Sequence, residues 1–189
     1  SLDKLDTWAA SEMYFLDAAS KGQKNWDEAN RILFKTHLGG NVQYALELAK
    51  NYGNSGAYDE AIIVLDQFKS LSEIQQDFPM LDYYTGYYHL MNGNMTQALQ
   101  DFRDASMDPS DYCFPWRLEE LEILKTALKH NPRDSKGWYY LGNLHYHLNQ
   151  KENAISNWEQ SVSIDENFSY AWRNLGYAYE KVSHDLNKS

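Results

Sequence analysis

The chain has 189 residues with 43% hydrophobic residues, a composition that argues against disorder. Its formal net charge of −10 argues against nucleic acid or an anionic membrane surface as a partner, because both attract basic faces. No apolar run approaches the ~20 residues of a membrane span. Cys113 is the only cysteine, so no intrachain disulfide is expected, and a reducing compartment, the cytoplasm, is the expected location.

Helical spacing of apolar residues occurs along the whole chain, and no alternating strand pattern appears. The first helical pair is divergent and covers approximately residues 10–41, ending at a Gly-Gly dipeptide. A second pair covers 42–75, and a third covers 79–110. Pro79 suits the first turn of a helix, and the third pair carries small residues at Gly86 and Ala98.

An irregular break is predicted near 108–115, where Pro109 and Pro115 interrupt the helical pattern. A single strong helix follows in the sequence WRLEELEILKTALKH. It fits the second helix of a pair, so the segment 116–134 is predicted to be a half repeat that lacks its first helix.

The segment 135–168 is the most regular part of the chain, and its pattern begins again directly after it. The first signature residues recur with that period: Trp138, Leu141 and Gly142 are followed by Trp172, Leu175 and Gly176, with Ala154 and Trp158 between them. A period of about 34 residues together with the W-x-x-L-G pattern resembles the tetratricopeptide repeat (TPR), a helix–turn–helix unit that stacks on its neighbours.

The resemblance implies an all-α TPR superhelix, a solenoid of about ten helices in a single domain over 1–189. The last segment, 169–184, is predicted to be a first helix without its partner. Close helix crossing is expected at Gly86, Gly142 and Gly176, opposite small residues of the second helices such as Ala98 and Ala154. Trp138, Trp158 and Trp172 are expected in the core.

No motif for catalysis, metal or a cofactor is found. His145 and His147 lie two positions apart and therefore face different sides of a helix, whereas metal-binding helices space their ligands by four. Cys113 lacks a nucleophile motif and is expected to be packed. The acidic cluster at Glu119, Glu120 and Glu122 is stabilised by its position at a helix start. The chain is therefore predicted not to be an enzyme.

Binding of a protein or peptide is the leading hypothesis, since the TPR resemblance implies that the first helices line a concave face. The positions expected on that face are Tyr83, Tyr84, Tyr87, Lys136, Tyr139, Tyr140, Asn143, Tyr146, His147, Tyr170, Arg173, Asn174 and Tyr177. Tyrosine offers rigid contact area with a polar tip. The competing interpretation is that the tyrosines pack against neighbouring helices.

The pattern resembles only part of the TPR clamp for chaperone C-termini. Asn143 and Asn174 match its two asparagines, but Tyr139 stands where its lysine is expected. The set of clamp residues is therefore incomplete.

A second resemblance covers the C-terminal part of the chain, from Asp111 onward. Cys113-Phe114-Pro115, Asn131-Pro132 and Trp158-Glu159 look like the TPR region of long bacterial multidomain proteins, whose N-terminal part is similar to carbohydrate-handling domains. It implies an alternative role as an accessory module that contacts sugar or an enzyme domain of the same polypeptide. A third alternative is a homodimer through the last helix, where Trp172, Leu175 and Tyr179 are expected to be uncovered unless the chain continues.

Overall fold

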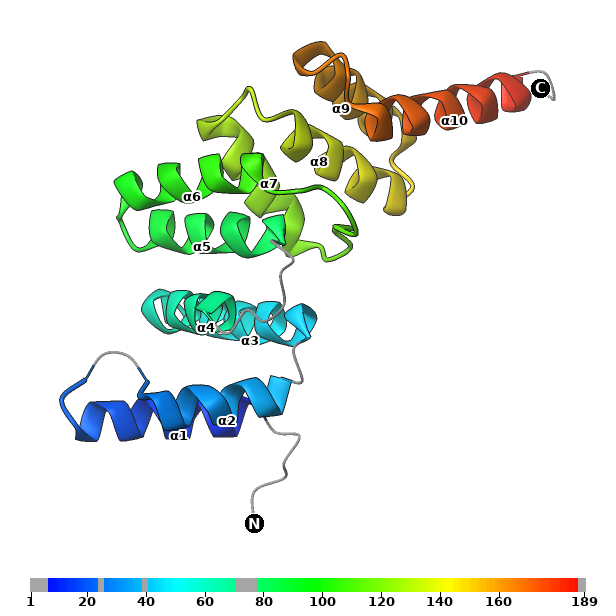
Figure 1. The fold of residues 1–189 in the computed structure, drawn as a ribbon. Helices are drawn as coiled ribbons and strands as arrows, with labels where there is room; N and C mark the ends of the chain where they lie inside the picture. The colour runs from blue at the N-terminus through cyan, green and yellow to red at the C-terminus, as the bar shows by residue number, and fades with distance from the viewer. Residues whose placement is uncertain (1–6, 24–25, 39–40, 71–77, 187–189) are drawn as a thin grey trace. The chain divides into compact units, whose positions relative to one another are not determined.

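The computed structural model describes residues 7–23, 26–38, 41–70 and 78–186. Within these ranges it contains ten α-helices and no strand, which confirms the all-α helical-repeat prediction (Figure 1). The helices are α1 (Thr7–Ser20), α2 (Glu28–Leu38), α3 (Val42–Asn54), α4 (Tyr58–Ser70), α5 (Pro79–Met91), α6 (Met95–Met107), α7 (Glu119–His130), α8 (Ser135–His147), α9 (Lys151–Ile164) and α10 (Ser169–Leu186).

The chain forms two compact units. The first comprises Ser1–Asp77 and Tyr88–Met95, and the second comprises Phe78–Tyr87 and Thr96–Ser189. Helix α5 therefore contributes its first turns to the second unit and its last turns to the first. The prediction of a single domain remains a prediction.

Aromatic packing organises the first unit, where α1 pairs with α2 and α3 pairs with α4. The Trp8 ring of α1 stacks on the Tyr52 ring of α3 with centroids 4.5 Å apart. The Tyr52 hydroxyl donates to Glu12 Oε1 at 2.8 Å and lies 2.7 Å from Ser11 Oγ. Trp26 is buried with its ring edge-on to Phe34, at a centroid distance of 4.7 Å. These contacts join α1 to α3 and fix the start of α2.

Helix α9 packs on α8 in the second unit, and α10 packs on α9 (Figure 1). Close approach of helices in this unit requires glycine at positions 86 and 142. A Cβ atom on Gly86 would lie 2.7 Å from the Phe102 ring of α6, and one on Gly142 would overlap the Trp158 ring of α9. Each glycine faces an aromatic residue at the same place in the second helix of its pair. The two pairs α5–α6 and α8–α9 therefore share one packing rule.

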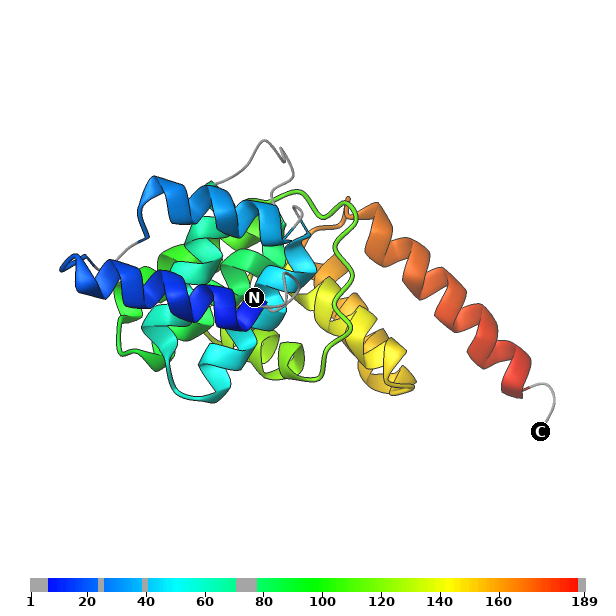
Figure 2. The same ribbon diagram turned by 90° about the horizontal axis from the view of Figure 1, so that it is seen from below.

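The structure corrects three expectations about the signature residues. The glycines face Phe102 and Trp158 rather than the alanines, although Ala98 and Ala154 are fully buried nearby in their helices. A Cβ atom on Gly176 would have no neighbour within 4 Å. Trp158, Leu141 and Leu175 are buried, but Trp138 is only half-buried and Trp172 is 51% exposed. Trp172 lies one turn before Gly176 on α10, which is the last helix that the structure describes and packs on α9 (Figures 1 and 2).

Residues 108–118, which we call the strap, connect α6 to α7 without a helix, and this confirms the predicted break. From Tyr112 to Leu118, buried and exposed side chains of the strap alternate. Cys113, Pro115 and Arg117 are buried, whereas the intervening large side chains are exposed: Tyr112, Phe114, Trp116 and Leu118. An extended chain presents successive side chains to opposite sides. The half repeat that ends with α7 lacks a first helix, and the strap supplies buried side chains in its place.

Buried polar groups hold the strap and the start of α8. The Tyr83 hydroxyl donates to Asp134 Oδ2 at 2.6 Å, while the Gly137 amide donates to Asp134 Oδ1 at 2.9 Å. Asp134 is thereby the N-cap of α8 and a tether to α5. Burial raises the pKa of Asp134. The Lys136 ammonium group donates to the carbonyls of Met107 and Asp108 at the start of the strap.

Glu120 has a structural role at the other end of the strap. Its Oε2 accepts hydrogen bonds from the backbone amides of Trp116 and Arg117, at 2.7 and 2.8 Å. The Arg117 guanidinium lies 3.6 Å from Oε1. Burial raises the pKa of Glu120 despite these partners. Glu120 belongs to the acidic cluster with Glu119 and Glu122, and its hydrogen bonds fix the turn that leads into α7.

Candidate functional site

A hollow of about 380 Å³ lies between α8 and α10, and we call it the α8–α10 hollow. Its walls combine aromatic and hydrogen-bonding side chains from α8, α9, α10 and the strap. They are Phe114, Tyr139, Asn143, Tyr146, Trp158, Arg173, Asn174 and Tyr177. None of the eight is acidic, and one is cationic.

Two asparagines at the floor of the hollow are oriented by a shared hydrogen-bond network. Asn143 Oδ1 accepts from Trp158 Nε1 at 3.0 Å and from Asn174 Nδ2 at 2.8 Å. Because the indole N–H only donates, the amide oxygen of Asn143 must face Trp158. The Asn143 amide nitrogen is consequently directed away from this network and donates to no group that the structure describes. The network leaves N–H donors of Asn143 available to a ligand.

Aromatic rings form the walls around this floor. The Tyr146 ring lies 5.5 Å from the Trp158 ring and 6.4 Å from the Tyr177 ring, measured between centroids. Tyr177 is 51% exposed, and Phe114 of the strap is 62% exposed. The Arg173 guanidinium lies 5.5 Å from the centroid of the Tyr170 ring. Apolar walls with a few convergent polar groups are typical of a ligand site.

Six of the thirteen positions predicted on the concave face line this hollow: Tyr139, Asn143, Tyr146, Arg173, Asn174 and Tyr177. Tyr83, Tyr84 and Tyr140 are instead fully buried. Burial raises the pKa of the Tyr83 and Tyr140 hydroxyls. These three tyrosines pack between α5, α7, α8 and the strap, so they are not part of an exposed binding surface.

Four predicted positions lie outside the hollow. Lys136 is engaged with the strap carbonyls, and the Tyr170 hydroxyl donates to Asp111 Oδ1 of the strap at 2.6 Å. His147 is exposed and Tyr87 is half-buried, and neither lines the hollow. Lys136 and Tyr170 therefore tie the strap to α8 and α10.

Sequence reasoning missed two residues of the hollow, Phe114 and Trp158. Trp158 was assigned to the core, and it does pack on Gly142 while its indole edge reaches the hollow. No signal in the sequence indicated this second role, because the register places Ala154 rather than Trp158 opposite Gly142. Phe114 belongs to the irregular strap, where no helical register predicts which way a side chain points.

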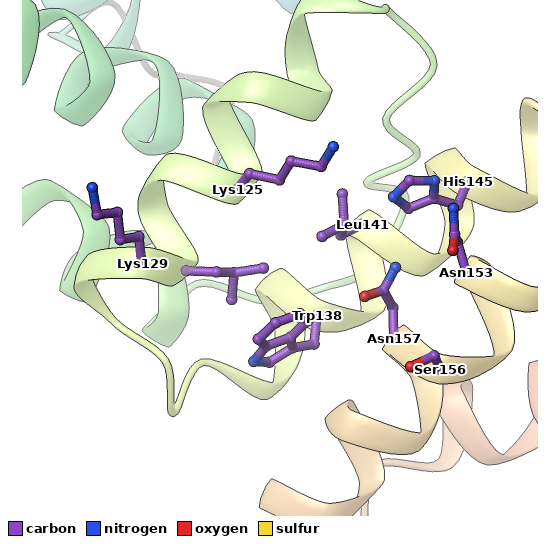
Figure 3. Close-up of a pocket in the computed structure, with 9 residues that line it drawn as sticks. Lys125, Lys129, Trp138, Leu141, His145, Asn153, Ser156 and Asn157 are labelled. Carbon is purple, nitrogen blue, oxygen red and sulfur yellow. The ribbon is translucent and has the colours of Figure 1, made fainter.

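A second hollow of about 490 Å³ lies on a different face of α8, and we call it the α7–α9 hollow (Figure 3). Figure 3 shows side chains of α7 and α9 on its two sides, with α8 residues between them. It is lined by Lys125, Leu128, Lys129, Trp138, Leu141, His145, Asn153, Ser156 and Asn157. This hollow is more polar in its lining than the first, and it contains two lysines.

One segment of the chain matches a known family of repeats. Residues 135–168 match the family model described as Tetratricopeptide repeat, and this segment coincides with α8, α9 and the turn before α10. The chain is thus an all-α helical-repeat protein, one segment of which is similar to the tetratricopeptide repeat. No curated protein matches the chain. No helix in the described ranges is long and apolar enough to cross a membrane.

Several solved structures resemble the chain at low similarity. A crystal structure of MamA is 22% identical, covers 88% of this chain and 83% of its own, and has a TM-score of 0.38. MamA 41-end from Desulfovibrio magneticus RS-1 is 18% identical, covers 96% and 89%, and has a TM-score of 0.38. The first TPR of Spaghetti (RPAP3) bound to the HSP90 peptide SRMEEVD is 16% identical, covers 75% and 92%, and has a TM-score of 0.34. Likenesses this low support no argument about a ligand.

Proposed function

We propose that the chain is a non-catalytic scaffold that binds a peptide segment of a partner protein in the α8–α10 hollow. The observation that carries this proposal is the shared hydrogen-bond network at Asn143, which uses the amide oxygen and leaves the N–H donors of this lining residue of an aromatic hollow without a described acceptor. A peptide backbone offers carbonyl acceptors at regular intervals, and its apolar side chains fit between aromatic rings.

The chemistry of the walls favours a peptide that carries an apolar or aromatic side chain beside a carbonyl or carboxylate group. Tyr146, Tyr177 and Phe114 supply the contact area. Arg173 supplies one cation with a planar fork of donors. The partner could be a separate protein or another domain of the same polypeptide.

Selection from a random peptide library, followed by NMR titration of the selected peptides, tests this proposal. We expect the indole N–H signal of Trp158 to shift, because that group lies at the floor of the hollow. Tyr177→Ala and Arg173→Ala each weaken binding, since both side chains are exposed in the hollow and neither holds the core. Arg103→Ala on α6, outside the hollow, is the matched control and leaves binding unchanged. Selected peptides that leave the Trp158 signal in place would refute the assignment.

A carbohydrate-linked role is the second candidate, and the exposed rings of Tyr177 and Phe114 favour it because flat aromatic faces can stack on sugar rings. In that case the chain would be an accessory module of a larger carbohydrate-active protein, as the bacterial resemblance implies. A glycan array separates the two candidates. Binding of a glycan that is lost in Tyr177→Ala but retained in Arg173→Ala supports the second candidate, whereas an empty array with captured peptides supports the first.

A further inference from the structure

We propose that the α7–α9 hollow is a second binding site, for an acidic peptide segment of a partner protein. It lies on a different face of α8 from the α8–α10 hollow and shares no residue with it. The proposal is therefore independent of the function proposed above.

Charge is the first argument. The whole chain carries a net charge of −10, yet no carboxylate lines this hollow. Lys125 and Lys129 lie one turn apart on α7, and both are exposed. Neither forms an ion pair or hydrogen bond with any group in the part of the chain that the structure describes. Figure 3 shows the Lys125 side chain extended over the hollow toward the side where His145 lies.

The rest of the lining suits a peptide better than a free ion. Leu128 and Leu141 are buried beneath the hollow, and the half-buried Trp138 ring is fixed because its Nε1 donates to the Pro132 carbonyl at 3.0 Å. Ser156 and Asn157 on α9 make no side-chain hydrogen bond with any described group. A volume of about 490 Å³ holds several side chains rather than one carboxylate. Carboxylates would contact the lysines while an apolar side chain contacts Trp138.

The internal repeat shows that a lysine at position 125 is not required for packing. The positions one repeat period after Lys125 and His145 are Glu159 and Tyr179. There the Tyr179 hydroxyl donates to Glu159 Oε1 at 2.5 Å, so a hydrogen bond within the protein joins the two helices at this corner. In the α7–α9 hollow the same corner contains a lysine without a partner among the described residues and a histidine whose Nδ1 lies 2.6 Å from Gln150 Oε1. A lysine without a described partner is therefore not repeated at the equivalent corner one period later.

The test uses an amidated oligo-glutamate peptide that carries one phenylalanine and a fluorescein label. Amidation removes the terminal carboxylate, and the six tryptophan indole N–H signals report where the peptide binds. We expect the Trp138 signal to shift and the Trp158 signal to stay in place. Substituting both lysines, Lys125→Gln and Lys129→Gln, weakens binding by about tenfold, as expected for two partly exposed ion pairs.

The matched control removes two positive charges elsewhere, by Lys50→Gln and Lys69→Gln on α3 and α4. It leaves the affinity within about twofold, because neither lysine lines the hollow and both already have partners within the protein. Equal weakening in both double variants would show non-specific attraction and overturn the proposal. So would the absence of any Trp138 shift at millimolar peptide.

Discussion

The indole of Trp158 occupies the space that a Cβ atom on Gly142 would fill. The ring cannot move away freely, because it is buried and its Nε1 donates to the Tyr139 carbonyl and to Asn143 Oδ1. One contact thus joins the packing of α8 on α9 to the floor of the α8–α10 hollow.

Gly142→Ala is expected to destabilise the protein by about 1–3 kcal/mol, because the added methyl group displaces the ring. Gly176→Ala is the matched control at the equivalent repeat position in α10, where a Cβ meets open space. It should stabilise by up to about 1 kcal/mol through helix propensity alone. Thermal unfolding followed by circular dichroism measures both. Equal changes in the melting temperature would contradict the packing described for Gly142.

Asp134→Ala is expected to cost about 2–4 kcal/mol, since it removes the N-cap of α8 and leaves the buried Tyr83 hydroxyl without its acceptor. Asp134→Asn retains a hydrogen bond to each neighbour, because its oxygen accepts from Gly137 and its nitrogen donates to the tyrosine oxygen. Urea unfolding of both variants measures the difference. A loss in the asparagine variant as large as that in the alanine variant would show that these hydrogen bonds are not the source of the effect.

The stability of the wild-type protein relative to Asp134→Asn should fall as pH rises. Burial raises the pKa of Asp134 above its ordinary 3.8, so the folded state holds the proton more tightly than the unfolded state. This contribution to stability is fully present below the unfolded pKa and is lost as pH rises through the folded pKa. Unfolding free energies from about pH 4 to about pH 7 measure it. Glu120 also has a pKa raised by burial and remains in both proteins, so its effect cancels in the difference.

Cys113 should be unreactive toward thiol reagents while the strap is in place. The side chain is fully buried, and burial raises the pKa of its thiol to about 12, so almost no thiolate exists at neutral pH. The rate of labelling with a disulfide reagent therefore reports opening of the strap. Lys136→Ala, which removes the bonds to the Met107 and Asp108 carbonyls, should increase this rate. Rapid labelling of the wild-type protein would contradict the described burial.

Self-association through α10 has a separate test. Trp172 is 51% exposed beside the open surface at Gly176. If two copies pair there, sedimentation at rising concentration shows a dimer, and Trp172→Glu abolishes it by burying an unpaired charge. A monomer at all concentrations rejects this alternative and leaves both binding hollows unaffected.

The repeat signature predicted the helices well because it reflects packing that recurs with a fixed period. Gly142 and Trp158 occupy the positions that Gly86 and Phe102 occupy in the α5–α6 pair, and this recurrence shows the pairing of helices in the sequence alone. The same register predicted that Asn143, Arg173 and Asn174 point to one face, and the structure brings them to one hollow.

The remaining parts could not be predicted because they depend on contacts that do not repeat. The register placed Tyr83 and Tyr140 on the concave face, but it contains no information about the strap, whose Cys113 lies among them. The exposure of Trp172 could not be predicted for the same reason. Trp172 and Trp138 stand in the same W-x-x-L-G sequence pattern, but the helices next to them differ.

The alternation of the strap constrains changes in its length. Cys113 and Pro115 face inward and Phe114 and Trp116 face outward, because an extended chain reverses side at each residue. An insertion or deletion of a single residue would exchange the two sets, and so expose the thiol while forcing large rings into the core. A two-residue change would preserve the order of sides. Homologous chains with this strap should therefore differ in its length by even numbers of residues.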